Sequence, residues 1–322
     1  MSDHDVVGLG AMNMDHLYSV RNIVMDGEDV VEDSGAFPGG SAANTVYGLG
    51  RLGVRTGFVG IVGDDDDGAR LVSDLKSVAV DTSRIAVSPG ARSGAVLCLT
   101  DRAGRRSMYV SPGANSLLSF SHIDLGYLNT ARFVHISSFV HDDQFGLQMK
   151  VLGSMLSLAR ISFSPGALYA SKGLKTLTPL LEKTHVLFVN QREIEQMTGG
   201  NYVKGSRECI KRGCGIVVVT FGSGFVVGER RTIVSYIRDQ AGEYEVEPVE
   251  MSWQPHLETT GAGDAFAAGF LYGQLSKKNV RDCAVIGDIM ARFCITRRGA
   301  RPGLPTLEDL SRRYHDLTGQ TL

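Results

Sequence analysis

The chain has 322 residues, of which 43% are hydrophobic and 21% charged, as in folded proteins and unlike disordered or collagen-like chains. Its 33 Lys and Arg against 35 Asp and Glu give a net charge of −2, which excludes the positive surface of a general nucleic-acid binder. Apolar runs stay short of the roughly 18–20 residues of a bilayer span, and the N-terminus is acidic where a signal peptide would be basic, so we expect a cytoplasmic protein without a membrane partner.

Short apolar runs alternate with helical patterns along most of the chain. The apolar runs predict strands at Val6–Met12, Gly57–Val62, Arg132–Ser137, Val186–Asn190 and Ile216–Thr220. The helical patterns lie between or after them, at Ser41–Leu52, Gly68–Val78, Gly146–Ala159, Ser171–Leu181, Gln191–Thr198 and Ser206–Gly213. Ser41 is the expected N-cap of the first helix, and Gly53 follows its end. This alternation favours an α/β fold with a mostly parallel central sheet flanked by helices on both faces.

Two stretches interrupt the alternation. Leu17–Phe37 shows few helix signals, and Ser93–Thr100 with Arg106–Val110 predicts a hairpin whose turn places Gly104 at a positive-φ position. We expect these pieces to form a small β-sheet lid, inserted from about 17–37 and 93–111 into a single domain of residues 1–322. Because a small sheet needs one face covered, we also expect a homodimer through the lid.

Glycine and cysteine usage narrows the kinds of site to look for. The 39 glycines exceed the usual share of about 7%, which directs the search to turns and backbone-mediated binding loops. The five cysteines are odd in number and form no C-x-x-C pair, so we expect buried free thiols. The histidines show no metal-binding spacing, which makes a zinc site improbable.

The sharpest motif is Glu258-Thr259-Thr260-Gly261-Ala262-Gly263-Asp264, which leads into an Ala-rich apolar segment. A glycine-rich turn that feeds a helix leaves backbone N–H groups pointing at one place, and the helix dipole adds positive potential there. The motif therefore predicts an anion hole. Asp264 is either a helix cap or a catalytic carboxylate beside the anion, and we expect it to be ionised at neutral pH, as an ordinary Asp is.

Two further motifs lie near the N-terminus. Gly39-Gly40-Ser41-Ala42-Ala43-Asn44 pairs two glycines, which let a ligand approach the backbone closely, with Asn44 one turn into the helix. Asn13-Met14-Asp15 places two polar side chains on one side of an extended chain. Both patterns favour a binding site, although a tight strand-to-helix connection explains the paired glycines equally well.

Two more motifs follow predicted strands in the second half of the chain. Asn190-Gln191-Arg192-Glu193 stands at the end of one strand, where open α/β sheets bind ligands, and its two oxygen-bearing side chains suit a hydrated Mg²⁺. Thr220-Phe221-Gly222-Ser223-Gly224 follows the next strand and forms another backbone-rich turn.

The order of these motifs along the chain resembles that of the ribokinase-like carbohydrate kinases of the PfkB family. The motifs are, from the N-terminus, G-G-x-x-x-N, N-x-x-E, T-x-G-x-G, T-T-G-A-G-D and the terminal Gly299-Ala300. Ser111-Pro112-Gly113-Ala114-Asn115 is also similar to that family, and the resemblance covers Val6 to about Pro305. It implies a ribokinase-like fold with a β-sheet lid. It further implies a kinase that uses Mg²⁺ and transfers the γ-phosphoryl group of ATP to a hydroxyl of a small ribose- or fructose-like sugar.

The resemblance also implies a role for each matching residue. Asp264 matches the general base, and the hole for the γ-phosphoryl group is matched by Gly261, Ala262 and Gly263. Contacts to substrate hydroxyls are matched by Asn13, Asp15, Gly39, Gly40 and Asn44. Asn190 and Glu193 match residues that hold Mg²⁺ through water, and the nucleotide cradle is matched by Thr220, Gly222 and Gly224. The family's lid covers the sugar and in many members pairs with a second subunit.

Two positions depart from the family pattern. Glu258 stands where the family usually has Asp. The region that contains Glu258 and Thr260 binds a monovalent cation such as K⁺ in many relatives. The dependence on that cation is therefore open. Asp288 stands where many relatives have an Asn near the adenine, so we place it in the nucleotide site and leave the preferred phosphoryl donor open.

Three alternatives remain. A nucleoside kinase on the same fold would bind the same ribose ring. A catalytically silent sugar- or nucleotide-binding sensor is suggested by Glu258 and Asp288, although an intact Asp264 argues against it. A nucleotide-dependent oxidoreductase is suggested by Gly8-Leu9-Gly10-Ala11-Met12, which begins like a dinucleotide loop but has Asn13 in place of the third glycine.

Overall fold

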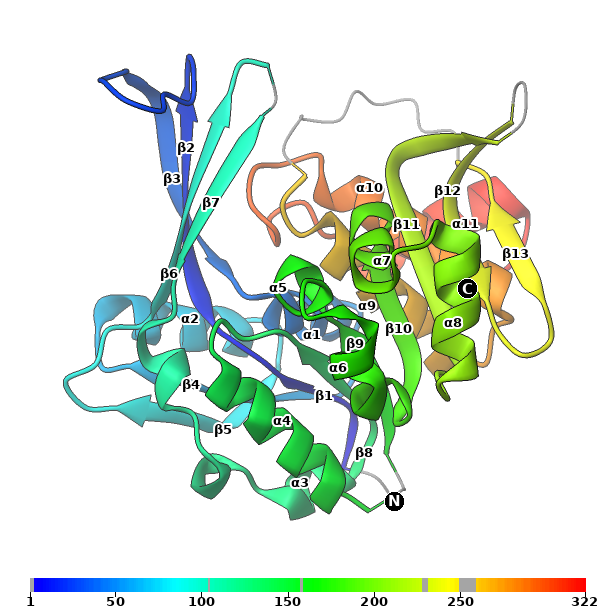
Figure 1. The fold of residues 1–322 in the computed structure, drawn as a ribbon, viewed down its shortest axis with the longest axis horizontal. Helices are drawn as coiled ribbons and strands as arrows, with labels where there is room; N and C mark the ends of the chain where they lie inside the picture. The colour runs from blue at the N-terminus through cyan, green and yellow to red at the C-terminus, as the bar shows by residue number, and fades with distance from the viewer. Residues whose placement is uncertain (1–2, 104, 157–158, 228–230, 249–258) are drawn as a thin grey trace.

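Nine strands form the large sheet of the computed structural model, which describes residues 3–103, 105–156, 159–227, 231–248 and 259–322 (Figure 1). In spatial order they are β13 (Glu243–Val246), β12 (Arg231–Arg238), β11 (Ile216–Val227), β10 (Thr184–Asn190), β9 (Arg160–Ser164), β8 (Ala131–Ser137), β1 (His4–Leu9), β4 (Thr56–Gly63) and β5 (Asp81–Ser88). Neighbours from β11 to β5 run parallel, while β12 and β13 are antiparallel additions at one edge. The predicted, mostly parallel sheet is confirmed.

Helices cover both faces of this sheet, as predicted. One core is built with α1 (Ser41–Arg51), α2 (Asp66–Lys76), α9 (Ala262–Leu275), α10 (Val280–Cys294) and α11 (Leu307–Thr318). The other is built with α3 (Leu125–Asn129), α4 (Asp142–Ser154), α5 (Gly166–Ala170), α6 (Gly173–Leu181), α7 (Gln191–Thr198) and α8 (Tyr202–Lys211). Successive strand side chains alternate between the cores: Val6 joins the first and Val7 the second. Burial on both sides explains the near-continuous apolar runs of the strands.

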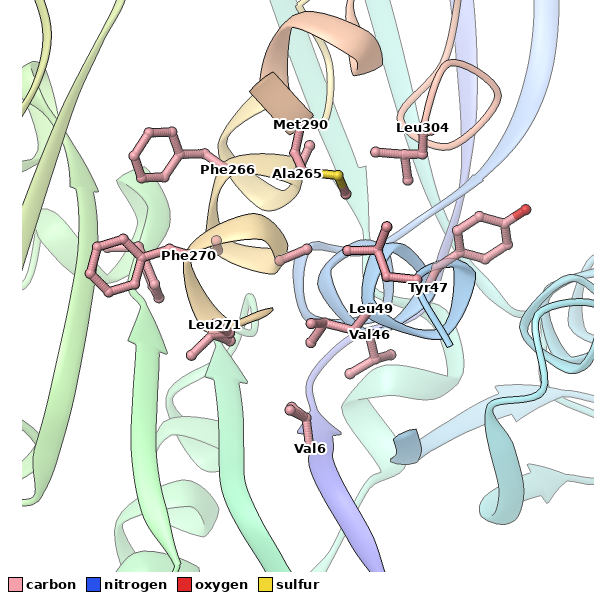
Figure 2. Close-up of a cluster of buried hydrophobic side chains, with 14 of the residues drawn as sticks. Val6, Val46, Tyr47, Leu49, Ala265, Phe266, Phe270, Leu271, Met290 and Leu304 are labelled. Atoms are coloured by element: carbon pink, nitrogen blue, oxygen red, sulfur yellow. The ribbon is translucent and has the colours of Figure 1, made fainter. Parts of the chain in front are cut away.

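Helix α9 packs closely against both α1 and α10 (Figure 2). A Cβ atom on Gly48 of α1 would lie 3.0 Å from the Cβ of Ala268 in α9, and one on Gly269 would lie 2.7 Å from the carbonyl oxygen of Ile286 in α10. Glycines at these contacts let the helix axes approach. The packing sets the first turn of α1 beside the first turn of α9.

A second sheet of four strands stands to one side of the large sheet (Figure 1). Its order is β3 (Val31–Gly39), β2 (Asn13–Val20), β6 (Gly94–Asp101) and β7 (Arg106–Ser111). This sheet is the lid, and it begins four residues before the predicted start at Leu17, because Asn13–Asp15 pairs with Gly94–Val96. Asp15, Val96 and Val110 are cross-strand neighbours on one of its faces. The predicted turn residue Gly104 lies outside the described residues.

Other predicted elements differ in their limits. Val6–Met12 is not one strand: β1 ends at Leu9, and the Asn115 side chain bonds both the N–H and the carbonyl of Met12 before β2 begins. The N-cap of α1 is Gly40, with φ 97°, and not Ser41. Helix α4 begins at Asp142 rather than Gly146, and residues 157–158 at its predicted end are not described.

Strands β5, β9, β12 and β13 had no sequence prediction, and helices α3, α5, α10 and α11 were likewise not predicted. Among the described residues, no helix combines the length and apolar character needed to cross a membrane.

Candidate active site

A cavity of about 300 Å³ lies between the lid and the chain that follows β1 and β8. We call it the lid cavity. It is lined by the predicted residues Asn13, Asp15, Gly40, Asn44, Gly261 and Asp264, and its other polar lining includes Ser41, Arg106, Asn115, Ser138, Thr259 and Thr260. Much of the remaining lining is apolar, from Val96, Met108, Val110, Phe139, Val140 and Leu168. The fold thus brings most of the predicted substrate residues to the predicted catalytic carboxylate.

Asp264 receives two side-chain hydrogen bonds from α1. Ser41 Oγ donates to Asp264 Oδ1 over 2.7 Å, and Asn44 Nδ2 donates to Asp264 Oδ2 over 2.8 Å. Burial raises the pKa of Asp264 to about 6, although these two bonds and the charge of Arg301 favour the ionised form. The pKa of Asp264 therefore lies above that of an ordinary Asp. A carboxylate with a pKa near 6 is still mostly ionised at pH 7 and is a better proton acceptor than an ordinary Asp.

The first turn of α9 begins at a glycine cap. Its N-cap is Gly261, in the left-handed region at φ 79°, and no side-chain cap bond is formed. A Cβ atom on Gly261 would lie 2.4 Å from the Cβ of Ala300, so the Gly299-Ala300 motif packs directly beneath the turn. A Cβ atom on Gly263, by contrast, would have no protein atom within 4 Å. The space beside Gly263 is therefore open, as an anion hole requires, while the Ala262 N–H donates to the carbonyl oxygen of Thr259 over 3.2 Å.

A second cavity of about 420 Å³ lies on the other side of this turn. Ala262 and Gly263 line it together with the predicted nucleotide residues Thr220, Gly222 and Asp288. Asp288 accepts a hydrogen bond from Arg292 Nε over 2.8 Å. Gly224 does not line this cavity; a Cβ atom there would lie 2.5 Å from the Thr232 side chain. Since Thr259 lines both cavities, the two meet at the 259–264 turn.

Asn190 and Glu193 form a capping box at the start of α7. Asn190 Oδ1 accepts from the Glu193 N–H, and Glu193 Oε2 accepts from the Asn190 N–H, each over 2.9 Å. The pKa of Glu193 is raised, first by burial and also by the charge of Asp264. Neither residue lines the two cavities. In the described part of the chain, no three His, Cys, Asp or Glu side chains gather to hold a metal ion by themselves.

The Ser111–Asn115 motif positions the first predicted substrate residue. Asn115 Nδ2 donates to Asn13 Oδ1 over 2.9 Å, which directs the Asn13 amide nitrogen away from this bond. A Cβ atom on Gly94 would lie 2.3 Å from the same Asn13 oxygen. Gly39 has a similar role next to Asp15, because a Cβ atom there would lie 2.2 Å from Asp15 Oδ2. Gly39 thus supports the cavity without lining it.

Two arginines at the site were missed by the sequence analysis. Arg106, on β7, donates to Thr260 Oγ1 over 2.7 Å and to Thr259 Oγ1 over 3.2 Å, and it lines the lid cavity. Strand alternation could have found it, because Arg106 shares a lid face with Met108 and Val110. Arg301 is buried and directly follows the Gly299-Ala300 motif, which by itself did not point to it. Glu258 lies outside the described residues.

The family model for the pfkB family carbohydrate kinases matches residues 3–307. The chain belongs to this family. It is 34% identical over 265 residues to an uncharacterized sugar kinase of Archaeoglobus fulgidus, covering 81% of this chain and 100% of the relative. The PfkB chain is therefore a phosphotransferase whose acceptor is an alcohol group, in an ATP-using family.

Solved structures confirm the ribokinase-like fold. An Arabidopsis thaliana ribokinase complexed with ribose and ATP matches with a TM-score of 0.80 at 21% identity, over 97% of this chain and 98% of that one. A nucleoside kinase of Methanocaldococcus jannaschii matches with a TM-score of 0.80 at 20% identity, over 98% and 100%. The dinucleotide-loop interpretation fails, because Gly8 lies inside β1 against Phe58 and Gly10 packs against Ser137.

Proposed function

We propose that this PfkB protein transfers the γ-phosphoryl group of ATP to a hydroxyl of a small ribose- or fructose-like sugar, with Asp264 as the general base. The observation that carries the proposal is the place of Asp264, which lines the lid cavity while Ala262 and Gly263, just before it, line the second cavity. A sugar in the first and a nucleotide in the second would meet at this turn.

The residues around the turn fit in-line transfer. A sugar hydroxyl in the lid cavity would donate its hydrogen bond to the Asp264 carboxylate, which takes the proton as the oxygen attacks phosphorus. The N–H groups of Gly261, Ala262 and Gly263 would stabilise the charge of the transferred group. Arg106 adds a positive charge from the lid, since it already contacts Thr259 and Thr260 at this turn. Positioning and charge stabilisation are what phosphoryl transfer chiefly needs.

Mg²⁺ would be held through water by Asn190 and Glu193. Their oxygens suit a hydrated divalent ion, and the charge of Asp264 contributes to the raised pKa of Glu193. The ion would offset the charge of the nucleotide phosphates. A monovalent cation such as K⁺ beside Thr260 and Glu258 stays a prediction.

A nucleoside is the second candidate acceptor, because one wall of the lid cavity is apolar. The polar groups Asn13, Asp15 and Asn44 suit the hydroxyls of a ribose ring, while the apolar lid and loop side chains opposite suit the face of a base. A small sugar leaves this wall in contact with water; a nucleoside covers it.

The lid also supports the proposal of a homodimer. A cytoplasmic location stays a prediction. The far face of the lid carries Leu97 and Tyr109, which are 40% and 60% exposed, and with His16 and Tyr18 they line a shallow hollow. A second copy would cover these apolar groups. Light scattering tests this: a mass of about 35 kDa at every concentration, that of the 34.7 kDa monomer, would contradict it.

The test of function is a coupled ADP-release screen over ribose, fructose, other sugars, sugar phosphates and nucleosides. We expect turnover with ATP and Mg²⁺ for a sugar or a nucleoside, loss of turnover in EDTA and recovery with Mg²⁺ or Mn²⁺. Binding of a sugar and ATP without any ADP release would instead identify the silent sensor.

A further inference from the structure

Arg301 is a buried arginine that donates hydrogen bonds to residues of the candidate active site and its surroundings. Its side chain lies among buried residues, and the residue is 3% exposed. Arg301 Nε donates to Asn44 Oδ1 over 2.9 Å, and Nη2 donates to the carbonyl oxygen of Gly39 over 3.0 Å. Nη1 pairs with Asp74, and the guanidinium lies 5.1 Å from the centre of the Tyr47 ring. The buried charge is therefore paired, with each of its nitrogens bonded.

The bond to Asn44 decides which way that amide faces. A guanidinium only donates, so it takes the amide oxygen, and the amide nitrogen is left to donate to Asp264 Oδ2 over 2.8 Å. The opposite orientation would set the amide oxygen against the carboxylate and the amide nitrogen against the guanidinium. Arg301 thus selects the one orientation of Asn44 that supports an ionised Asp264.

We propose that Arg301 is a positioning residue for phosphoryl transfer, which orients Asn44 toward Asp264 and ties this pair to the end of lid strand β3 through Gly39. The inference rests on the proposed function of Asp264 as general base. The positive charge of Arg301 also acts on Asp264 directly, since it is one of the influences that favour the ionised carboxylate.

The alternative is that Arg301 merely holds the segment after α10 against α1. Arg51 is a matched control for this role, because its Nε donates to the carbonyl oxygen of Leu304 over 2.7 Å. It ties the same segment to the same helix without a bond to Asn44. Replacing Arg51 should loosen the segment and leave the hydrogen bonds of the Asn44 amide in place.

The experiment compares Arg301→Met, Arg301→Lys and Arg51→Met with the wild type in steady-state kinetics. We expect Arg301→Met to lower kcat by about 10²-fold, the scale of a misplaced catalytic group, with little change in the KM for ATP. It should also move the acidic limb of the kcat/KM profile to higher pH. Arg301→Lys keeps the positive charge but not the planar guanidinium, whose N–H groups bond several acceptors at once. Compared with Arg301→Met, it should recover part of kcat and most of the wild-type pH profile.

A double-mutant cycle separates positioning from structure. In an Asn44→Ala background, Arg301→Met should add less than a threefold loss, because its effect passes through Asn44. If Arg301→Met lowers kcat as much in the Asn44→Ala background as in the wild type, the inference is overturned. A kcat for Arg301→Met within threefold of that for Arg51→Met would also overturn it. If Arg301→Met does not fold, a folded Arg301→Lys with the full wild-type kcat overturns it, because the lysine cannot hold Asn44 as the guanidinium does. A wild type without ATP-dependent turnover would instead refute the proposed function itself.

Discussion

Helices α7 and α9 both begin beside the site, yet their first turns are completed in opposite ways. At α7, the side chains of Asn190 and Glu193 bond the backbone N–H groups of each other's residues, which closes the turn. At α9, the N-cap is Gly261, which has no side chain to cap the helix, and a Cβ atom on Gly263 would have no protein atom within 4 Å. One helix start is capped by its own side chains, and the other has no side-chain cap and keeps open space at Gly263.

The difference teaches how to distinguish a capping motif from a binding motif. N-x-x-E is the pattern of a capping box, and in this protein it forms one. G-A-G-D contains an acid that could cap, but Asp264 instead receives bonds from Ser41 and Asn44 of a different helix. A side chain held by another element, and not by its own helix, is the stronger sign of a functional role. The predictions below test this contrast.

The largest expected effect is that of Asp264→Asn. The amide keeps the shape of the side chain but cannot accept the proton of the acceptor hydroxyl, so kcat should fall by about 10²–10⁴-fold. The affinity for ATP should change little. Steady-state kinetics with the acceptor found in the screen provides the measurement, and a variant that keeps more than about a tenth of wild-type kcat would show that Asp264 is not the base.

The same variant should be more stable at pH 7.5. Because burial raises the pKa of Asp264 from its ordinary value to about 6, the folded state binds this proton more tightly than the unfolded state. That contribution to stability is present below about pH 4 and lost as the pH rises through 6. Asn avoids the buried charge, so thermal melts at pH 7.5 should show a gain of about 1–3 kcal/mol. A loss of stability would contradict a raised pKa.

The second effect concerns the open turn of α9. Gly263→Ala meets no protein atom and suits a helix, so the fold should be kept, while the new methyl group stands where a phosphoryl group would approach the N–H groups. We expect turnover to fall by about 10²-fold, as when an oxyanion donor is lost. Gly146→Ala in α4, where a Cβ atom also has open space, is the matched control and should keep full activity. Equal activities of the two variants would show that no ligand approaches Gly263.

The third effect is on the pH profile. Protonation of Asp264 removes the base, so kcat/KM should fall by about tenfold per pH unit below the pKa of about 6. Measurements from pH 4.5 to 8 at constant ionic strength provide the test. A profile that stays flat down to pH 4.5 would mean that the base has an ordinary Asp pKa or is another group.

The smallest effect concerns the closed turn of α7. Glu193→Gln can still form the capping box but loses its charge, so the fold should be kept while the Mg²⁺ concentration for half-maximal activity rises by about tenfold. Asp309→Asn is the control, since Asp309 forms the same kind of box with Thr306 at the start of α11. A Glu193→Gln variant with the wild-type Mg²⁺ requirement would make the box a structural cap alone.

Much of the fold could be predicted because its signals are local. The apolar runs of β4, β8 and β10 and the helical pattern of α1 depend on neighbouring residues, and the structure has these elements close to the predicted limits. Errors occurred where a distant contact decides the limit. The Asn115 side chain separates β1 from β2 at Met12, and residues more than a hundred positions apart have no pattern in common.

The sequence by itself determined the family, the α/β class and the residue types of the site, because glycine turns and carboxylates at fixed spacing have few other uses. Only the tertiary structure decided how these residues work together. Packing of α1 against α9 sets Ser41 and Asn44 on Asp264, and burial there raises its pKa. Arg301 joins Asn44 from 257 positions away. Burial and the direction of a hydrogen bond depend on what surrounds a group in space, which the local pattern of a chain does not contain.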